Sequence, residues 1–165
     1  MSNDITPLLW FNGKAEEAVD FYVASFSDSK LSNVSRYGAE GPGDEGEVMM
    51  IEFSLEGRDY LALNGGDGDE QDSGSDIPQG GIALFVTCQT QAEVDRLWER
   101  LGEGGEYLPC GWLRDKFGFA WNIVPSGLGE LLGNPDREKA GRAMKAMMEM
   151  GKLDINELRR AAEEG

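Results

Sequence analysis

The sequence contains no histidine, only two cysteines, and about half as many basic residues as acidic ones. The absence of imidazole excludes catalytic arrangements of the Ser–His and Cys–His kinds and every metal site with a histidine ligand. Two cysteines, Cys88 and Cys110, are too few for a disulfide framework, so we expect buried or half-buried free thiols. A reactive thiol needs a base or a cation beside it, and Arg114 is the cation nearest to Cys110 in the sequence.

Long apolar runs are also missing, since no stretch approaches the roughly 18 residues that a membrane span requires. The first ten residues, MSNDITPLLW, lack the basic region and apolar segment of a secretory signal, so we expect a cytoplasmic protein. The formal charge is −16, and a surface of that sign repels nucleic acid and anionic membranes. The acid excess favours solubility. The alternative is adaptation to a high-salt cytoplasm, where screening weakens self-repulsion.

What is present is a globular composition, 165 residues with 40% hydrophobic, enough for one domain with a sizeable core. Residues 5–64 follow the order strand, helix, strand, strand, strand. An apolar run at 5–11 precedes an Asn12-Gly13 turn and a stripe with helical spacing. Residues 30–37 suit a strand, 48–55 alternate in polarity, and a Gly57-Arg58 turn leads into a return strand that ends at Asn64. The helical stripe consists of Ala15, Ala18, Val19, Tyr22 and Phe26.

Residues 65–80 are typical of a Gly/Asp/Ser linker, and their acids do not follow the order of a calcium-binding loop. Residues 81–125 then repeat the first pattern, with a strand at 82–88, a helix around 94–101, and short strands at 106–113, 114–117 and 119–124. The two helices align, so that Glu17 and Phe21 correspond to Glu93 and Leu97. The predicted fold class is α+β, with tandem βαβββ units in one domain over residues 1–165.

The tail, residues 134–165, predicts a C-terminal pair of helices. Asn134-Pro135 opens the first helix, which carries a methionine-rich stripe, and Asp154 with Glu157 resembles a capping box at the start of the second. Methionine packs adaptably against irregular surfaces. We expect the stripe to pack on its own domain, and the alternative is a groove for a partner protein.

This duplicated pattern resembles the vicinal oxygen chelate superfamily, which has the glyoxalase and bleomycin-resistance fold, and within it the PhnB-like family. Members of that family are commonly labelled demethylubiquinone 3-methyltransferase-like or glyoxalase-like. The acidic linker at 67–79 departs from the shorter, more apolar turn that the family usually has. The matching segments are LLWFNGKAEEAVDFY (8–22), YLALNGG (60–66), TQAEVDRLWERL (90–101), PCGWLRDKFGFAWNIVPS (109–126) and REKAGRAMKAMMEMGKLDINEL (137–158).

The resemblance also implies where a metal would bind. Metal-using members of the superfamily carry His, Gln or Glu at four inward positions, which fall here near Pro7, Ala62, Gly81 or Ile82, and Asn122. Only Asn122 offers a side-chain oxygen, whereas a catalytic divalent metal needs about three protein ligands. We therefore expect neither a metal nor another cofactor, and neither glyoxalase nor dioxygenase chemistry. Nor does the sequence contain the glycine-rich turn of a Rossmann-type site for S-adenosylmethionine.

What remains is a predicted metal-free cleft between the two units. By strand parity and the repeat, the candidate ligand-binding residues are Tyr60, Asn64, Cys110, Trp112 and Asn122. Glu52, beside Met50, and Cys110 could reach the same space and are the weak candidates for an acid/base group, although a working base at Glu52 would need burial. Core packing is the competing interpretation for Trp112 and Trp121, and a turn or an ion pair is the competing interpretation for Asp115.

Three functions stay open at this point. The first is a binding module that holds a small, partly apolar molecule, as resistance-type relatives sequester drugs. The second is a metal-independent enzyme that uses the same cleft, either a glyoxalase-like lyase or isomerase or the methyltransferase of the family label. The third is an interaction protein that docks a partner through its methionine-rich helix. The family commonly pairs two chains across sheet edges, so the resemblance also implies a homodimer.

Overall fold

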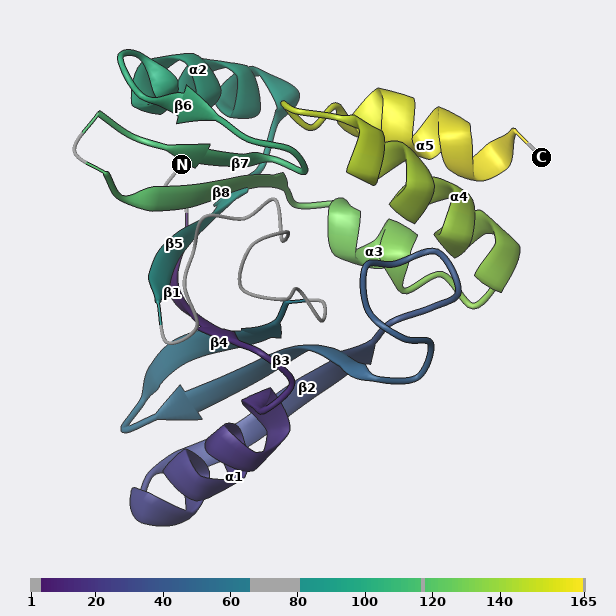
Figure 1. Cartoon of the computed structure of the whole chain (residues 1–165). Coiled ribbons are helices and arrows are strands. Elements are labelled where there is room, and N and C mark those ends of the chain that lie inside the picture. Colours follow the sequence, from purple (N-terminus) through teal and green to yellow (C-terminus); the bar gives the residue numbers. More distant parts are fainter. Residues whose placement is uncertain (1–3, 66–80, 117, 165) are drawn as a thin grey trace. The chain divides into compact units, whose positions relative to one another are not determined.

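The computed structural model describes residues 4–65, 81–116 and 118–164, and the predicted linker therefore lies almost wholly outside the described residues. The elements alternate as two βαβββ units followed by helices, which confirms the α+β class with a helical C-terminal extension (Figure 1). They are β1 (Asp4–Phe11), α1 (Ala15–Ser25), β2 (Ser29–Arg36), β3 (Val48–Leu55), β4 (Arg58–Asn64), β5 (Ile82–Cys88), α2 (Gln91–Gly102), β6 (Glu106–Tyr107), β7 (Trp112–Arg114), β8 (Ala120–Pro125), α3 (Leu128–Leu132), α4 (Arg137–Glu149) and α5 (Ile155–Glu163).

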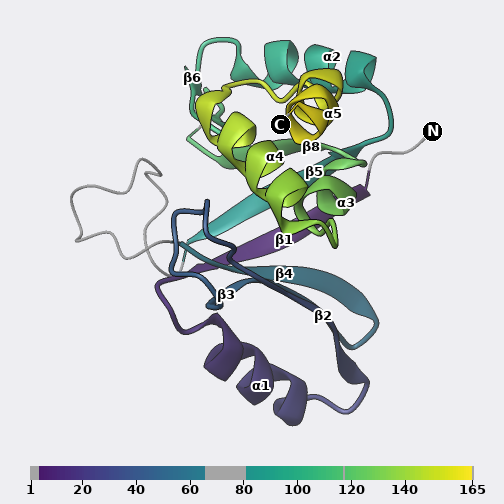
Figure 2. The same ribbon diagram turned by 90° about the vertical axis from the view of Figure 1, so that its right-hand side faces the viewer.

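The described residues divide into two compact units. We call the one within residues 6–83 the first unit, and the one formed by residues 84–164 together with residues 4 and 5 the second unit. In the first unit the strand order is β2-β3-β4-β1, with β1 parallel to β4 and the other neighbours antiparallel. Helix α1 covers one face of these strands (Figure 2). Ala15 and Val19 of the helix pack there against Ile51, Phe53 and Ala62 of the sheet.

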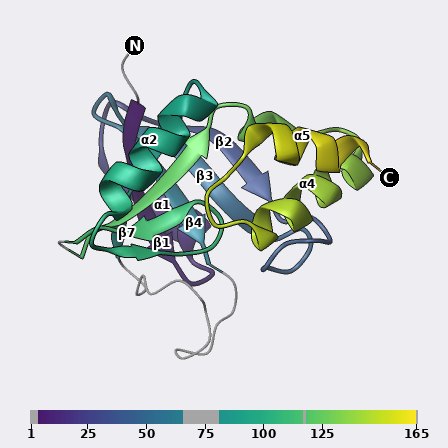
Figure 3. The same cartoon turned by 90° about the horizontal axis from the view of Figure 1, so that it is seen from above.

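The second unit repeats this arrangement with the order β5-β8-β7-β6, in which β5 and β8 are parallel. Helix α2 covers one face (Figure 3). Its Val94 and Trp98 pack on Val86, Leu113 and Ile123. The helix begins at a capping box, in which Thr90 Oγ1 accepts from the N–H of Glu93 while the Glu93 carboxylate accepts from the N–H of Thr90.

The three short strands at the end of the second unit differ from the prediction. The predicted strand at 106–113 is interrupted, because Cys110 and Gly111 both have positive φ, 63° and 79°, and the N–H of Trp112 donates to the carbonyl of Pro109. Two consecutive residues of positive φ are typical of a tight hairpin turn. The strand predicted at 114–117 does not exist as such. Instead β7 ends at Arg114, and the N–H of Gly118 donates to the carbonyl of Asp115 in the turn to β8.

The C-terminal helices pack side by side, α4 against α5 (Figures 1 and 2). Asp136, and not Asn134, caps α4, because its carboxylate accepts from the N–H groups of Glu138 and Lys139. Asp154 caps α5 as predicted. The methionine-rich stripe packs within its own unit, where Met144 is buried and Met147 lies against the core around Val124. Among the described residues, no helix has both the length and the apolar character to cross a bilayer.

Candidate functional site

One face of the second unit carries two of the five predicted ligand-binding residues, Trp112 and Asn122. Trp121 and Ile123 of β8 point toward α2, so Asn122 between them lies on the opposite face. Trp112 of β7 and Phe85 of β5 are the direct strand partners of Asn122 and share that face. We call Phe85, Trp112 and Asn122 the aromatic–amide row. It places a carboxamide between two aromatic side chains, a combination that suits a partly apolar ligand.

The carboxamide of Asn122 is held in a fixed orientation. Its Nδ2 donates to the backbone carbonyl of Cys110 at 3.1 Å, and its side chain is only 7% exposed. Since a carbonyl can only accept, the nitrogen must face Cys110 and the oxygen must face the other way. No described residue donates to Asn122 Oδ1. Among the described residues Oδ1 is also not one of the fully buried polar atoms that lack a partner, so this oxygen can be reached by a donor from a ligand.

The turn that carries Cys110 is held by the chain between α4 and α5. The N–H groups of Cys110 and Gly111 donate to the carbonyls of Met150 and Gly151, each at 2.8 Å. A Cβ on Gly111 would lie 2.9 Å from the carbonyl oxygen of Ile123, so only glycine fits this close approach. The Cys110 carbonyl that orients Asn122 is therefore fixed from two sides.

Neither thiol has the character of a nucleophile. Burial raises the pKa of the Cys110 thiol above its usual value. Burial, followed by the charge of Glu93, raises the pKa of Cys88 to about 11. A thiol whose pKa is raised stays protonated at neutral pH, and the thiolate is the reactive form. These shifts weaken the case for Cys110 as an acid/base or nucleophilic group.

Tyr60 and Asn64 do not join the aromatic–amide row. They lie on the same strand face as Ala62, as predicted, but α1 covers that face. Both lie on the face of the first unit that α1 covers, where Tyr60 packs against the α1 core and stacks on Phe53 at a ring separation of 5.6 Å. Asn64 Oδ1 accepts from the N–H of Ala15 at 2.9 Å, while its Nδ2 donates to the carbonyl of Val48. The carboxamide of Asn64 therefore caps α1.

Glu52 and Met50 lie on the other face of the first unit, which corrects the expectation that they share a space with Tyr60. In the β3–β4 hairpin Glu52 pairs with Leu61 and Met50 with Leu63, whereas Phe53 pairs with Tyr60. A two-residue turn pairs even-numbered residues of β3 with odd-numbered residues of β4, so an even-numbered residue of β3 and an even-numbered residue of β4 lie on opposite faces. Glu52 is exposed, so it lacks the burial that the proposed role as a base requires.

The residues at the four metal positions of the superfamily do not form a donor set. Ala62 is buried beneath α1, Ile82 is exposed, and Pro7 supplies no side-chain donor. Asn122 already uses its amide nitrogen on Cys110. In the described part of the chain no group of three or more Cys, Asp or Glu side chains is arranged to hold a metal ion. The donor chemistry at these positions does not fit a catalytic divalent metal.

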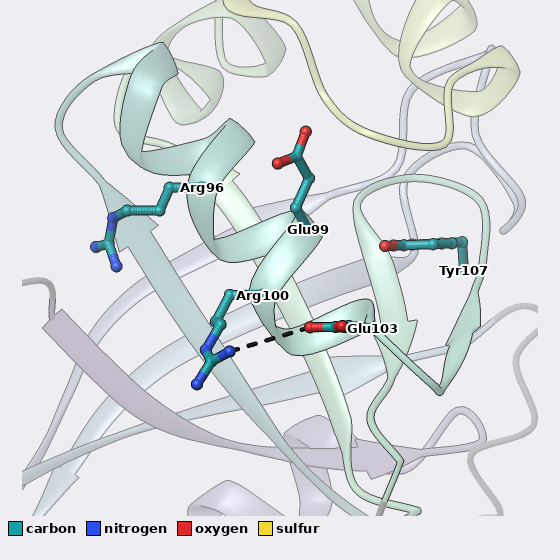
Figure 4. Close-up of a pocket in the computed structure, with 5 residues that line it drawn as sticks. All are labelled: Arg96, Glu99, Arg100, Glu103 and Tyr107. Atoms are coloured by element: carbon teal, nitrogen blue, oxygen red, sulfur yellow. Dashed lines mark ion pairs between the residues drawn. The ribbon is translucent and has the colours of Figure 1, made fainter.

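A second feature of the same unit is a shallow hollow of about 580 Å³ on the outside of α2 (Figure 4). Exposed side chains of both signs line it, with Arg100 and Glu103 paired at 4.0 Å. The ring of Tyr107 stacks on Trp98 at 4.9 Å, and Gly102 makes room for it. Exposed pairs of this kind contribute little to binding or stability. We do not assign a function to this hollow.

The sequence analysis missed two contributors to the aromatic–amide row. Phe85 occupies a buried strand and gave no signal beyond its apolar character, so only the pairing of β5 with β8 places it beside Asn122. The connector between α4 and α5, residues 150–154, gave no signal in the sequence that its Met150 and Gly151 carbonyls hold the Cys110 turn. Asp115, by contrast, serves a turn as predicted, because its carboxylate accepts from the N–H of Phe119 and from Trp121 Nε1.

Comparison with known proteins shows to which family the chain is similar. A family model described as 3-demethylubiquinone-9 3-methyltransferase matches residues 3–124, so α3, α4 and α5 lie beyond the match. A protein from Staphylococcus aureus of known structure is 30% identical, with a TM-score of 0.53, over 73% of this chain and 95% of its own. A PhnB protein from Bacillus cereus is 32% identical, with a TM-score of 0.36, over 73% and 97%. Protein PA1353 from Pseudomonas aeruginosa is 23% identical, with a TM-score of 0.33, over 72% and 95%. A search of curated proteins found no match.

Proposed function

Because the chain belongs to the PhnB-like family, whose model matches residues 3–124, we propose that it binds a small, partly apolar molecule on the aromatic–amide row. The observation that carries the proposal is the pairing of Asn122 with Trp112 and Phe85 across three neighbouring strands. Two aromatic side chains supply apolar contact area, and the amide between them supplies one directional polar contact. Such a set favours an organic ligand over an ion.

Two features make this row suited to binding. Phe85 packs against the core of the C-terminal helices, so one wall of the row is fixed. Asn122 is fixed by Cys110, whose turn is itself held by Met150 and Gly151. A site whose side chains are already ordered loses less conformational entropy on binding than a mobile one.

The family description names a methyltransferase, and that reaction implies S-adenosylmethionine. A Rossmann-type site would need free N–H groups at a strand-to-helix turn. At the β1–α1 turn the N–H of Ala15 is taken by Asn64, and at the β5–α2 turn the N–H of Glu93 is taken by Thr90. These residues do not fit such a site, and we derive no methyl-transfer step. The metal-independent enzyme would need Glu52 or Cys110 as its acid/base group, and neither has the required environment.

The interaction function is the third candidate, and it has less support. Its proposed surface, the methionine-rich stripe of α4, is largely engaged with α3 and α5 in the same unit. Met148 is the stripe methionine that stays exposed, at 42%. The homodimer implied by the resemblance stays a prediction.

The test of the proposed function is an NMR titration with p-cresol as the probe. The chain has four tryptophans, and ¹⁵N labelling gives an indole signal for each. We expect p-cresol to shift the Trp112 signal and to leave in place the signals of Trp98, on α2, and Trp121, on the sheet face that α2 covers. Trp112→Ala lacks the reporting indole, so its binding is followed on the p-cresol signals instead. This variant should abolish binding, whereas the matched control Phe21→Ala, at an exposed aromatic of α1, should not. Equal effects on all four indoles would refute a localised site.

A further inference from the structure

The orientation of the Asn122 amide narrows the class of ligand, and this step rests on the proposed function. Nδ2 is committed to the Cys110 carbonyl, so the row presents an acceptor and not a donor. A ligand that brings an O–H or N–H group to Oδ1 pairs with an acceptor to which no described residue donates. A ligand without a donor leaves that acceptor unpaired on displacing water, which costs affinity.

The net charge of the chain narrows the class of ligand further. An anionic ligand would bring its acceptor oxygens against Asn122 Oδ1 in a chain with a formal charge of −16. A neutral ligand avoids both the contact between two acceptor oxygens and the repulsion by the negative net charge. The flanking side chains, Trp112 and Phe85, add flat apolar contact on either side of the amide.

We propose that Asn122 makes this site selective for neutral aromatic molecules that carry a hydrogen-bond donor, as a phenol or an aromatic amine does. Asn122 is then the specificity-determining residue, and Trp112 and Phe85 supply affinity without discriminating a donor from its methylated analogue. The backbone of Cys110 is a positioning element, because its carbonyl sets the side on which Oδ1 lies.

The test compares three probes of one shape on the unaltered full-length protein: p-cresol, its methyl ether 4-methylanisole, and 4-methylbenzoate. Affinity is read from the Trp112 indole signal. We expect p-cresol to bind about five-fold more tightly than 4-methylanisole, the factor that one neutral hydrogen bond provides. We expect 4-methylbenzoate to bind most weakly.

Two variants sharpen the assignment. Asn122→Leu removes the acceptor, so the preference for p-cresol over its ether should fall to about one-fold while both still shift Trp112. Phe21→Ala, at an exposed position of α1, is the control and should keep the preference. The wild-type comparison alone decides the matter if Asn122→Leu does not fold. Equal affinities of p-cresol and its ether, or tightest binding of 4-methylbenzoate, would overturn the inference and leave the proposed function standing. A Trp112 signal that no probe moves would overturn both.

Discussion

Asn64 Oδ1 accepts a hydrogen bond of 2.9 Å from the backbone N–H of Ala15, a residue 49 positions earlier in the chain. The amide at the end of β4 thus caps the first turn of α1. Lys14, at the N-cap position of that helix, provides no side-chain cap. A strand residue from the other end of the unit therefore supplies what Ser, Thr or Asp supplies at most helix starts.

Replacing this long-range cap should destabilise the first unit. Asn64→Ala removes the bond to Ala15 and leaves the carbonyl of buried Val48 without the Nδ2 donor. We expect a loss of about 2 kcal/mol in the free energy of unfolding, measured with urea. Asn33→Ala, at an exposed position of β2, is the matched control and should change little. Equal losses would contradict the capping role.

Tyr37 should make stability fall at high pH. Burial, followed by the charge of Glu47, raises the pKa of Tyr37 to about 12, and its hydroxyl donates to the carbonyl of Asn64. Gly43 lies so close to the Tyr37 ring that a Cβ on residue 43 would be 2.4 Å from ring carbons. Because the folded pKa exceeds the ordinary value of about 10, the contribution is complete below pH ~10 and is lost as the pH rises toward 12.

The measurement is the thermal midpoint between pH ~9 and 12, compared for the wild type and Tyr37→Phe. We expect the wild-type midpoint to drop more steeply across this window than that of the variant. Parallel curves would show that Tyr37 titrates no differently in the folded and the unfolded chain.

Cys110 should prefer glycine to alanine. Its φ of 63° lies in the left-handed region, which disfavours side chains other than Gly, Asn and Asp. Both variants remove the thiol, so their difference isolates the backbone. We expect Cys110→Gly to exceed Cys110→Ala in unfolding free energy by about 1 kcal/mol. A more stable alanine variant would place residue 110 outside the left-handed region.

Gln91 should hold the connector between α4 and α5 on the second unit. Its Nε2 donates to the carbonyl of Leu153 at 2.9 Å, and its Oε1 accepts from the N–H of Ile155 at 3.0 Å. Gln91→Ala should speed hydrogen exchange at Ile155 by about ten-fold or more, because a part-buried pair of bonds is lost. Gln89→Ala, an exposed neighbour, is the control. Unchanged exchange at Ile155 would show that the connector is held by other contacts.

The acid excess predicts stabilisation by salt. A formal charge of −16 repels itself, and screening by KCl weakens that repulsion. We expect the thermal midpoint to rise steadily with KCl concentration at neutral pH. A flat or falling curve would count against adaptation to high salt and would leave solubility as the meaning of the charge.

Most of the fold could be predicted because its signals are local. The polarity of residues 48–55 alternates with period two, and both ends of that strand match the structure. Asp154 is a typical N-cap residue, so the start of α5 could also be predicted from the sequence. The errors fall where a backbone conformation depends on distant partners. Cys110 adopts a positive φ because Met150 and Asn122 form hydrogen bonds with its backbone. These partners are distant in the sequence, so the residues next to Cys110 do not predict its conformation.

The same distinction, between local signals and contacts with distant residues, applies to the site residues. Trp112 and Asn122 were predicted from the sequence as ligand-binding residues, but their pairing with Phe85 depends on which strands become neighbours. The expectation that Glu52 shares a space with Tyr60 could have been corrected from the sequence, since any two-residue turn within 56–58 puts these two residues on opposite faces. The role of Asn64 as a cap could not, because Ala15 comes within reach only after β4 pairs with β1.

The sequence alone determined the duplicated βαβββ order, the helical tail and the lack of imidazole chemistry, because periodicity, capping and composition are properties of neighbouring residues. Only the tertiary structure decided which of two similar asparagines caps a helix and which offers an acceptor. Both end up buried, but Asn64 faces the N–H groups of a helix start, whereas Asn122 lies between two aromatic rings on the opposite side of its sheet. The two asparagines differ in the face of the sheet on which their side chains lie. That face is set by the register of strand pairing and not by the residue type.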